Sequence, residues 1–410
     1  MASILGAIRR NWQLLRPPEP AKQADALKFG ILGAADIAPM ALIVPAKSHP
    51  DVVIHAVAAR DKTRAAAYAK KHGIPNVLDS YEALLNDPSI DAVYIPLPNG
   101  LHFEWALRAL SKGKHVLLEK PSSSNATEAE ILFRSPLLTA QPQPVLLEAF
   151  HNRFSPAWAC FMAQVDQPNV EHVFARAHIP AILFDSNNIR FNYDLGGGGM
   201  MDLGTYAVAA LRGVFGAEPE ACDECEVEKM PPPQERCDGS FKVKFRFPGD
   251  RVGEIDGGLR APLMKLRMPS LTVTHRPVIV DEAEGENQTT RTRKVVFSNF
   301  LLPGFYHRID IEDEIVSKDK KTGQVINKVI NKESKKAYTF REMDVDRPGE
   351  IYWQTYRYML EQFVNRVRGR DTTAWVEHED SVAQMKALDM AYEKSGLGIR
   401  PTSQYRPESL

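Results

Sequence analysis

Short apolar runs separated by helix-like stretches dominate the first 150 residues. The stretches between the runs, such as residues 41–49 and 104–113, carry apolar residues at i, i+3 or i+4, the spacing of an amphipathic helix. Strands that alternate with helices at this interval predict βαβ units and a doubly wound parallel sheet. The runs are LKFGILG (27–33), VVIHAVAA (52–59), DAVYIPL (91–97), KHVLLE (114–119) and PVLLEA (144–149).

The pattern changes after about residue 155. Segments 171–180, 241–247, 254–260 and 271–280 alternate apolar and polar residues, as half-solvated antiparallel strands do. The charged stretches DEAEGENQTTRTRK and SKDKKTGQV between them are predicted to be solvated loops. Helical periodicity returns near the end, in IYWQTYRYMLEQFVNRV and EDSVAQMKALDMAYEKSG, with Gly396 or Gly398 as the stop signal. The fold class is therefore α/β, with a Rossmann sheet followed by a domain rich in antiparallel strands.

These changes of pattern predict four parts of the chain. Residues 1–26 form an N-terminal arm, which carries arginines but no acid in MASILGAIRRNWQLLRPP and faintly resembles a transit peptide. A short helix or loose arm that packs on the body is the preferred interpretation. Residues 27–152 form a dinucleotide-binding domain and residues 153–375 a substrate and dimerisation domain. Residues 376–410 form a helix and tail that pack back on the body.

Composition and charge exclude several classes of protein. A chain of 410 residues is too long for one ordinary core and suits two domains. The formal net charge of −1 gives no global field to attract nucleic acid or an anionic membrane, and no apolar run has the length of a membrane span.

Four cysteines are too few and too irregular for a disulfide scaffold, which favours a reducing cytoplasm. Cys222 and Cys225 form a CxxC without a second pair to complete a zinc site, so an exposed polar connection is expected there.

A glycine-containing turn follows the first predicted strand. In GILGAADIA, Gly33 takes the first position of the G-x-G-x-x-G/A fingerprint and Ala38 the third, while Ala35 replaces the middle glycine. Asp36 and Ile37 lie between them. This context predicts a pyrophosphate at a helix N-terminus, although a tight turn without a ligand would look the same.

The end of the second strand distinguishes two cofactors. An NAD site usually places an acid there, whereas this chain reads Ala58-Ala59-Arg60-Asp61, with Arg64 one helical turn on. Small residues followed by arginine leave room for the 2′-phosphate of NADP and supply a charged donor. NADP is therefore preferred. NAD stays open because Asp61 can instead reach the ribose, and Arg60 can be a surface residue paired with that acid.

Two more strand ends carry polar residues, Pro98-Asn99-Gly100-Leu101-His102 after residues 91–97 and Glu119-Lys120-Pro121 after residues 114–119. Ligands of such sheets bind at the carboxyl ends of the strands. Taken alone, each segment is equally a loop with a punctuating proline, and a lone lysine at a strand end is most often only solvated.

In combination, these motifs resemble the glucose–fructose oxidoreductase, inositol dehydrogenase and rhizopine-catabolism oxidoreductases. The motifs GILGAADIA (30–38), PNGLH (98–102), EKP (119–121) and GGGGMMDLGTY (196–206) occur in the order of that family. The resemblance implies a Rossmann domain, a C-terminal α/β domain with a large, mainly antiparallel sheet, and a homodimer through that sheet. It also implies that Lys120 is catalytic and that its bond to Pro121 is often cis.

Within the family, Glu148-Ala149-Phe150, Arg153 and Tyr206 resemble the branch of dimeric dihydrodiol dehydrogenases and NADP-dependent D-xylose 1-dehydrogenases. The pair His151-Asn152 departs from that branch close to the expected substrate pocket and leaves the substrate's identity open. Site roles follow from the resemblance for the catalytic residues Lys120, Tyr206 and Asp202, for the substrate contacts Lys120, Arg153, Asp202 and Tyr206, and for the cofactor contacts Pro98, Asn99, His102, Glu119, Lys120 and Pro121.

The predicted chemistry is hydride transfer between NADP and a small polyhydroxylated substrate, most simply an aldose such as D-xylose oxidised at C1 to a lactone. Either Lys120 or Tyr206 can manage the proton, and Asp202 shares a helix face with Tyr206 four residues later. A trans-dihydrodiol dehydrogenase or a carbonyl reductase of specialised metabolism would use the same site. A non-catalytic NADP-binding regulator is a further alternative, which the intact EKP motif disfavours.

Overall fold

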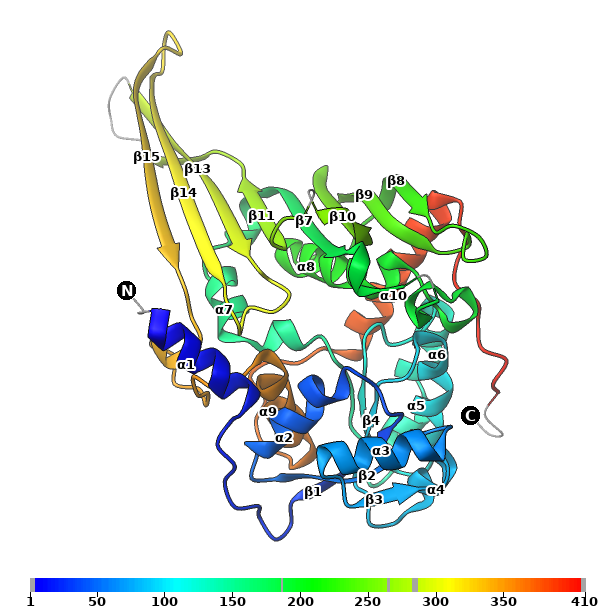
Figure 1. Cartoon of the computed structure of the whole chain (residues 1–410). Helices are drawn as coiled ribbons and strands as arrows, with labels where there is room; N and C mark the ends of the chain where they lie inside the picture. The colour runs from blue at the N-terminus through cyan, green and yellow to red at the C-terminus, as the bar shows by residue number, and fades with distance from the viewer. Residues whose placement is uncertain (1–3, 186, 264–265, 282–286, 407–410) are drawn as a thin grey trace.

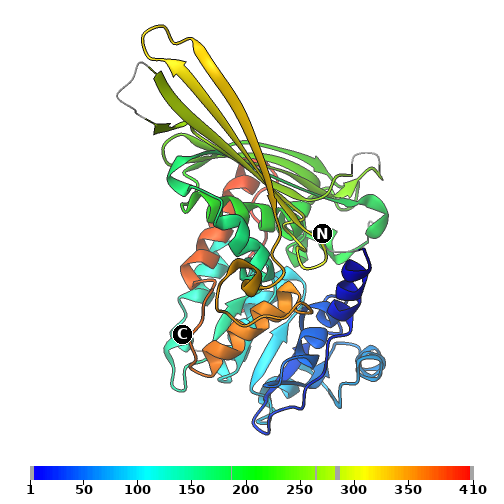
Figure 2. The same ribbon diagram turned by 90° about the vertical axis from the view of Figure 1, so that its left-hand side faces the viewer.

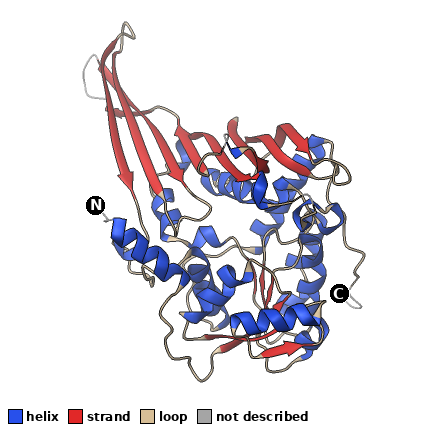
Figure 3. Cartoon of the chain, viewed as in Figure 1, coloured by secondary structure: helices blue, strands red, loops and turns tan. Residues whose placement is uncertain are grey.

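Two sheets with helices between them organise the chain (Figure 1). The computed structural model describes residues 4–185, 187–263, 266–281 and 287–406. One sheet has six strands in the order β3-β2-β1-β4-β5-β6, and the other has nine, with the path β15-β14-β13-β11-β7-β10-β9-β8 and β12 paired to β13. Figure 3 shows the strands gathered at the two ends of the molecule and most helices between or around them. The predicted fold class is confirmed.

The first sheet is parallel throughout and forms the doubly wound arrangement that the apolar runs predict. Its strands are β1 (Leu27–Leu32), β2 (Val52–Ala58), β3 (Asn76–Leu78), β4 (Ala92–Ile95), β5 (His115–Leu118) and β6 (Leu146–Glu148). The intervening helices are η1 (Pro39–Ile43), α2 (Val44–Lys47), α3 (Lys62–His72), α4 (Tyr81–Asn86), α5 (His102–Ser111) and α6 (Ala126–Phe133). Periodicity missed β3 and α4, because each is too short to show a clear period.

The strand order places a topological switch point between β1 and β4, where the connections leave in opposite directions. The side chains of β4 are fully buried, as expected for a strand covered on both faces. The carboxyl ends of β1, β4 and β5 therefore share one open edge, and the sequence motifs lie there.

The second sheet has one covered face and one open face. Its strands are β7 (Val170–Pro180), β8 (Ala221–Lys229), β9 (Asp238–Phe247), β10 (Arg251–Ala261), β11 (Ser270–His275), β12 (Val278–Asp281), β13 (Asn287–Ser298), β14 (Arg308–Asp319) and β15 (Val325–Lys335). Along β9, Phe241, Val243 and Phe245 are buried, whereas Lys242 and Lys244 point away. This alternation gives the sheet its core face, against which α8 (Thr205–Phe215) and α10 (His378–Ser395) pack.

Strands β13, β14 and β15 project beyond the body as a long ribbon (Figures 1 and 2). Residues 287–294 and 317–319 were predicted as loop but belong to β13 and β14. Charges fit this ladder because they pair across strands: Arg293 of the first segment pairs with Asp313 of β14 over 2.8 Å. The pairs Lys332–Glu312 and Lys328–Glu314 continue the match between β14 and β15. Residues 282–286 of the predicted loop lie outside the described residues.

Three helices connect the parts of the molecule. Helix α1 (Ile4–Leu15) contacts the second half of the chain, where the Arg10 guanidinium donates to the Phe305 carbonyl over 2.7 Å. Helix α10 packs on α6 and on β8, so the end of the chain contacts both halves. Helix α9 (Thr355–Val367), which the sequence assigned to the second domain, packs on α2, with Phe363 beside Phe29. The boundary at residue 375 stays a prediction, and α9 lies against the first domain.

The CxxC segment lies within β8, which corrects the expected exposed connection. Cys222 is buried and Cys225 half-buried, because a register irregularity after Cys222 turns both side chains toward the core. No helix in the described part of the chain combines the length and apolar character needed to cross a membrane.

Candidate functional site

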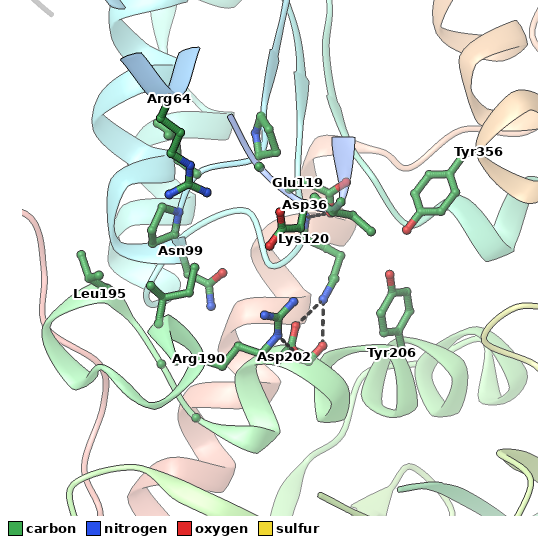
Figure 4. Close-up of a pocket in the computed structure, with 18 residues that line it drawn as sticks. Asp36, Arg64, Asn99, Glu119, Lys120, Arg190, Leu195, Asp202, Tyr206 and Tyr356 are labelled. Atoms are coloured by element: carbon green, nitrogen blue, oxygen red, sulfur yellow. Dashed lines mark hydrogen bonds and ion pairs between the residues drawn. The ribbon is translucent and has the colours of Figure 1, made fainter. Parts of the chain in front are cut away.

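A cavity of about 250 Å³ opens at the switch point of the first sheet, facing the start of α8 (Figure 4). One wall comes from loops after β1, β4 and β5, and the other from the segment between residues 189 and 206. It is lined by Ala35, Asp36, Ile37, Arg64, Pro96, Leu97, Pro98, Asn99, Glu119, Lys120, Ile189, Arg190, Leu195, Gly197, Gly198, Asp202, Tyr206 and Tyr356. Most of the residues predicted from the strand ends are therefore brought together at one place.

The turn after β1 supplies backbone donors to the cavity. Gly33 has φ +104°, and a Cβ there would lie 3.0 Å from Leu97 Cδ2, so the turn requires glycine. Within the described residues, the amides of Asp36 and Ile37 donate to no protein acceptor, and both residues line the cavity. Two unpartnered N–H groups at the carboxyl edge of this sheet fit the pyrophosphate of a dinucleotide.

Arg64 is the cation at this end of the cavity. Its Nη2 donates to the Ala34 carbonyl over 3.0 Å, which holds the guanidinium beside the turn. Asp61 is the N-cap of α3, because its carboxylate accepts from the Arg64 amide over 3.0 Å. Arg60 is exposed and does not line the cavity. The acid that kept NAD open is therefore engaged in capping a helix.

Lys120, Asp202 and Arg190 form the charged centre of the site (Figure 4). Lys120 Nζ lies 2.9 Å from both the Oδ1 and the main-chain oxygen of Asp202, and Arg190 Nε donates to Asp202 Oδ2 over 2.8 Å. Burial alone would raise the pKa of Asp202, but the two cations outweigh it and hold the pKa at about 2. The carboxylate is thus ionised and fixes Lys120 at the cavity wall.

Tyr206 lies next to this centre, with its ring centroid 4.8 Å from Lys120 Nζ. Its hydroxyl is 3.0 Å from His151 Nε2, and His151 Nδ1 is 2.8 Å from Thr355 Oγ1. Burial, followed by the charge of Lys120, lowers the pKa of His151 to about 3, so this ring is neutral. The phenol, imidazole and threonine hydroxyl form one connected chain of groups that can each donate and accept a proton.

Tyr356 completes this end of the cavity. Its ring stacks on His151 at 3.8 Å between centroids, and its hydroxyl points toward that of Tyr206 in Figure 4. Burial raises the pKa of both phenols well above the ordinary value, and the charges of Glu119 and Asp202 add to this effect. The neighbouring phenol raises the pKa of Tyr206 further, whereas it lowers that of Tyr356 against this trend. Both are therefore neutral phenols at physiological pH.

Glu119 and Asn99 line the cavity but are also tied to the protein. Glu119 Oε1 accepts from the Tyr94 hydroxyl over 2.6 Å, and burial raises the pKa of the carboxyl against the charge of Lys120. Asn99 Nδ2 donates to the Gly196 carbonyl over 3.0 Å. The amide thereby joins the loop after β4 to the glycine segment of the other wall.

His102 is a correction to the sequence interpretation. It was expected to contact the cofactor, but it is fully buried and does not line the cavity, with Nε2 2.7 Å from the Leu97 carbonyl and Nδ1 2.8 Å from the Pro121 carbonyl. Burial lowers its pKa to about 4 although both carbonyls favour the charged form. His102 thus joins the loop after β4 to the loop after β5 beneath the cavity wall.

The remaining predicted residues do not reach the cavity. Gly33 and Ala38 belong to the turn after β1 but do not line the cavity, and neither does the exposed Arg60. Pro121, joined to Lys120 by a cis peptide bond, does not line it either. Arg153, predicted to bind substrate, is instead ion-paired to Asp380, which also pairs with Arg212 at 2.8 Å. A partly buried acid therefore holds this arginine outside the cavity.

The glycine segment, residues 196–199, is also required by close packing within the protein, which the sequence did not reveal. A Cβ on Gly197 would lie 2.7 Å from the Arg190 and Asn192 carbonyls, and one on Gly198 would lie 2.4 Å from Asp238 Oδ1 and the Tyr392 hydroxyl. These glycines line the cavity on one side, but their missing side chains make room for the protein itself.

Sequence reasoning missed Arg190 and Tyr356 as parts of this site. Arg190 lies in a short 3-10 segment and Tyr356 on α9, far along the chain, and neither carries a local motif. His151 was noticed only as a departure from the related branch. The i, i+4 relation between Asp202 and Tyr206 holds, although a π-helical turn at Met200–Gly204 precedes α8.

Two family models match this chain. One, described as "Oxidoreductase family, NAD-binding Rossmann fold", matches residues 27–135. The other, described as "GFO/IDH/MocA C-terminal domain", matches residues 164–274. Together they cover more than half of the sequence and divide it where the structure divides into two sheets.

Characterised relatives align with about half of the chain. A D-xylose 1-dehydrogenase (NADP(+)) of Haloferax volcanii is 41% identical over 187 residues, which are 45% of this chain and 56% of the relative. A trans-1,2-dihydrobenzene-1,2-diol dehydrogenase of Xenopus tropicalis is 34% identical over 199 residues, 47% of this chain and 58% of the relative. The chain thus matches a little over half the length of each.

Solved structures share the whole architecture. A 3-ketoreductase from Actinomadura kijaniata, in complex with NADP and TDP-benzene, superposes with a TM-score of 0.66 at 20% identity, over 90% of this chain and 98% of that one. An aldose-aldose oxidoreductase from Caulobacter crescentus, complexed with glycerol, gives 0.63 at 16% identity over the same shares. At these identities the likeness shows a common fold.

Proposed function

This chain belongs to the GFO/IDH/MocA oxidoreductase family, and we propose that it transfers hydride between a nicotinamide dinucleotide and a hydroxyl-bearing carbon of a small substrate. The observation that carries the proposal is that Lys120 and Tyr206 line the same cavity as Asp36 and Ile37, whose amides are unpartnered within the described residues. The nicotinamide ring supplies the hydride chemistry when it is bound, so the protein must orient the substrate and manage one proton.

Lys120 and Tyr206 divide this task. Two of the three N–H donors of Lys120 are occupied by Asp202, and the third is available to a substrate oxygen. Tyr206 holds a phenolic proton and is hydrogen-bonded to the neutral imidazole of His151. We assign Lys120 to binding and polarising the substrate oxygen, and Tyr206 to exchanging the proton with it.

NADP is the preferred cofactor of the proposal. Arg64 lies at the end of the cavity away from Tyr206 and Tyr356 in Figure 4, where the adenosine half of a dinucleotide would reach. The Asp61 carboxylate caps α3, so it does not compete for a ribose hydroxyl. Arg64, held in place by its hydrogen bond to the Ala34 carbonyl, is a suitable charged donor for the 2′-phosphate of NADP.

We propose an aldose such as D-xylose, oxidised at C1 to a lactone, as the substrate. The charged centre at Lys120 and Asp202 suits hydroxyl groups, and the matched D-xylose dehydrogenase supports this choice. Oxidation of a trans-dihydrodiol is the second candidate, supported by the phenol rings at Tyr206 and Tyr356 and by the matched diol dehydrogenase. The same site serves either substrate, because both reactions remove hydride from a hydroxyl-bearing carbon.

A substrate screen tests the proposal. The purified chain is mixed with aldoses, polyols and trans-dihydrodiols, each with NADP or NAD, and the absorbance of the reduced cofactor is followed. Reduction of NADP by D-xylose is expected. Turnover only with dihydrodiols would replace the aldose proposal, and NADP binding without turnover of any compound would favour a regulator.

We also propose that two copies associate through the open face of the second sheet. That face carries no helix in the described structure, and Ile326 and Ile330 are about half exposed, at 55% and 47%, on the projecting ribbon. Light scattering after size exclusion tests it: a dimer is expected, and Ile330→Asp should raise the monomer fraction. A wild-type monomer at micromolar concentration would refute this proposal.

A further inference from the structure

A fully buried charge cluster lies directly behind the glycine segment of the cavity. Arg400, five residues past the end of α10, pairs with Asp238 at 3.2 Å, and neither side chain has any exposed surface. The Tyr392 hydroxyl donates to Asp238 Oδ1 over 2.9 Å, and the Arg400 guanidinium lies 3.7 Å above the Tyr392 ring. Buried ion pairs add little stability by themselves, so this cluster calls for another explanation.

The cluster binds the backbone that leads into Asp202. Arg400 Nε donates to the Gly197 carbonyl over 2.7 Å, and Asp238 Oδ2 accepts from the Met200 amide over 2.6 Å. The Tyr392 hydroxyl accepts from the Met201 amide over 3.2 Å. Three backbone groups within the five residues before Asp202 are therefore fixed by side chains from distant parts of the chain.

The same C-terminal segment also binds the loop that follows Lys120. Asn125 Nδ2 donates to the Arg400 carbonyl and to Thr402 Oγ1, each over 3.0 Å. The Ser403 amide donates to Glu128 Oε1 over 2.6 Å, while Glu128 Oε2 accepts from the Ser124 amide over 2.9 Å. Residues 400–403 thus contact both walls of the cavity, one through the Arg400 side chain and the other mainly through backbone groups.

We propose that residues 400–403, together with Tyr392 and Asp238, are a positioning clamp that sets Lys120 against Asp202. The two partners come from different domains, so their 2.9 Å contact depends on how the two walls are held. The catalytic consequence rests on the proposed function, whereas the geometric consequence does not. None of the clamp residues lines the cavity, so each acts through Lys120 and Asp202.

Tyr392→Phe is the sharpest test, because it keeps the ring beneath Arg400 and removes only the hydroxyl that joins Met201 to Asp238. Release of Asp202 should leave Lys120 less protected, so an amine-reactive label followed by mass spectrometry should modify it several-fold faster. Turnover should fall by about 10- to 100-fold, as for a misplacement of about 1 Å, with the Kd for NADP unchanged within about twofold. Tyr358→Phe is the matched control, since this buried tyrosine donates one bond to the Tyr338 carbonyl and does not line the cavity.

The outcomes separate the clamp from a purely structural role. Faster labelling of Lys120 in Tyr392→Phe than in Tyr358→Phe supports the clamp even if no substrate is turned over, a result that would count only against the proposed function. Equal labelling and equal turnover in the two variants, with a lowered Tm, would overturn the clamp. If Tyr392→Phe does not fold, the exposed Thr402→Val decides in the same way, with a smaller effect expected.

Discussion

Replacing Lys120 by methionine removes the ammonium group at the centre of the cavity while keeping most of the side chain's length. Lys120 Nζ makes two 2.9 Å contacts to Asp202, and its side chain is only 12% exposed. The variant leaves Asp202 with one cation, Arg190, and leaves a substrate oxygen without its donor. The loss of the ion pair lowers the stability of the fold, whereas the loss of the substrate donor lowers kcat, so the two effects are measured separately.

The stability loss can be worked from the pKa of Asp202. A folded pKa of about 2, against an ordinary value of 3.8, corresponds to about 2 kcal/mol of net stabilisation, after burial has offset part of the attraction of Lys120 and Arg190. Because the folded pKa is depressed, this term is fully present above pH 3.8 and is lost as the pH falls toward 2. Removing Lys120 should therefore cost at least about 1 kcal/mol at neutral pH, a fall in Tm of at least about 1 to 2 °C in a chain of this size.

The loss of turnover should be much larger. A positioned acid, base or electrostatic donor contributes about 10²- to 10⁴-fold in rate, so kcat should fall by that factor. The Kd for NADP, measured by quenching of protein fluorescence, should change little because Asp36, Ile37 and Arg64 are untouched. Lys112→Met, at an exposed position after α5, is the control. Turnover within about threefold of wild type, with cofactor binding retained, would show that the lysine assignment is wrong.

Three further substitutions test other parts of the reasoning. Arg64→Gln should weaken NADP binding by about 10-fold or more and NAD binding much less, as measured by titration, since it removes a charged donor; equal losses would count against the 2′-phosphate. His151→Phe should lower kcat about fivefold with KM unchanged, because it removes the partner of the Tyr206 hydroxyl; an unchanged kcat would exclude that role. Burial lowers the pKa of the His307 imidazole to about 4, so the folded protein favours the neutral ring. The contribution of this ring to the free energy of unfolding is therefore complete above pH 6.5 and is lost as the pH falls toward 4. The cost of His307→Gln in urea unfolding should therefore be about 2 kcal/mol smaller at pH 5 than at pH 7.5, and a pH-independent cost would contradict it.

The elements with long local patterns were predictable from the sequence. The apolar runs at 27–33 and 114–119 became β1 and β5, since a strand buried on both faces requires continuous apolar residues. The residues at the strand ends met at one edge because parallel strands end together. The ribbon of β13 to β15 was not predictable, because its charged residues match across strands only in a register that the sequence pattern does not reveal.

The residues of the candidate site likewise fall into those that a local motif predicts and those that only the fold reveals. Lys120 and Tyr206 follow motifs, whereas Arg190 and Tyr356 reach the cavity only through tertiary packing. Arg153 shows the opposite error, since a motif placed it at the substrate but Asp380 holds it elsewhere. A local pattern identifies a residue's type and neighbours, but which acid pairs with an arginine depends on the whole fold.

The two halves of the charged centre come from different parts of the fold, Lys120 from the edge of the first sheet and Asp202 from the helix that packs on the second. Lys120 follows β5, whereas Asp202 precedes α8, so no local structure fixes the distance between them. Ion pairs at this distance are sensitive to small displacements, because both the Coulomb term and the hydrogen bond weaken as the partners separate. Contacts outside the cavity that set the positions of the two walls, such as those of Arg400 and His102, must therefore influence turnover without touching a ligand. Substitutions there should change kcat more than nucleotide affinity, which depends on a turn contained within the first domain.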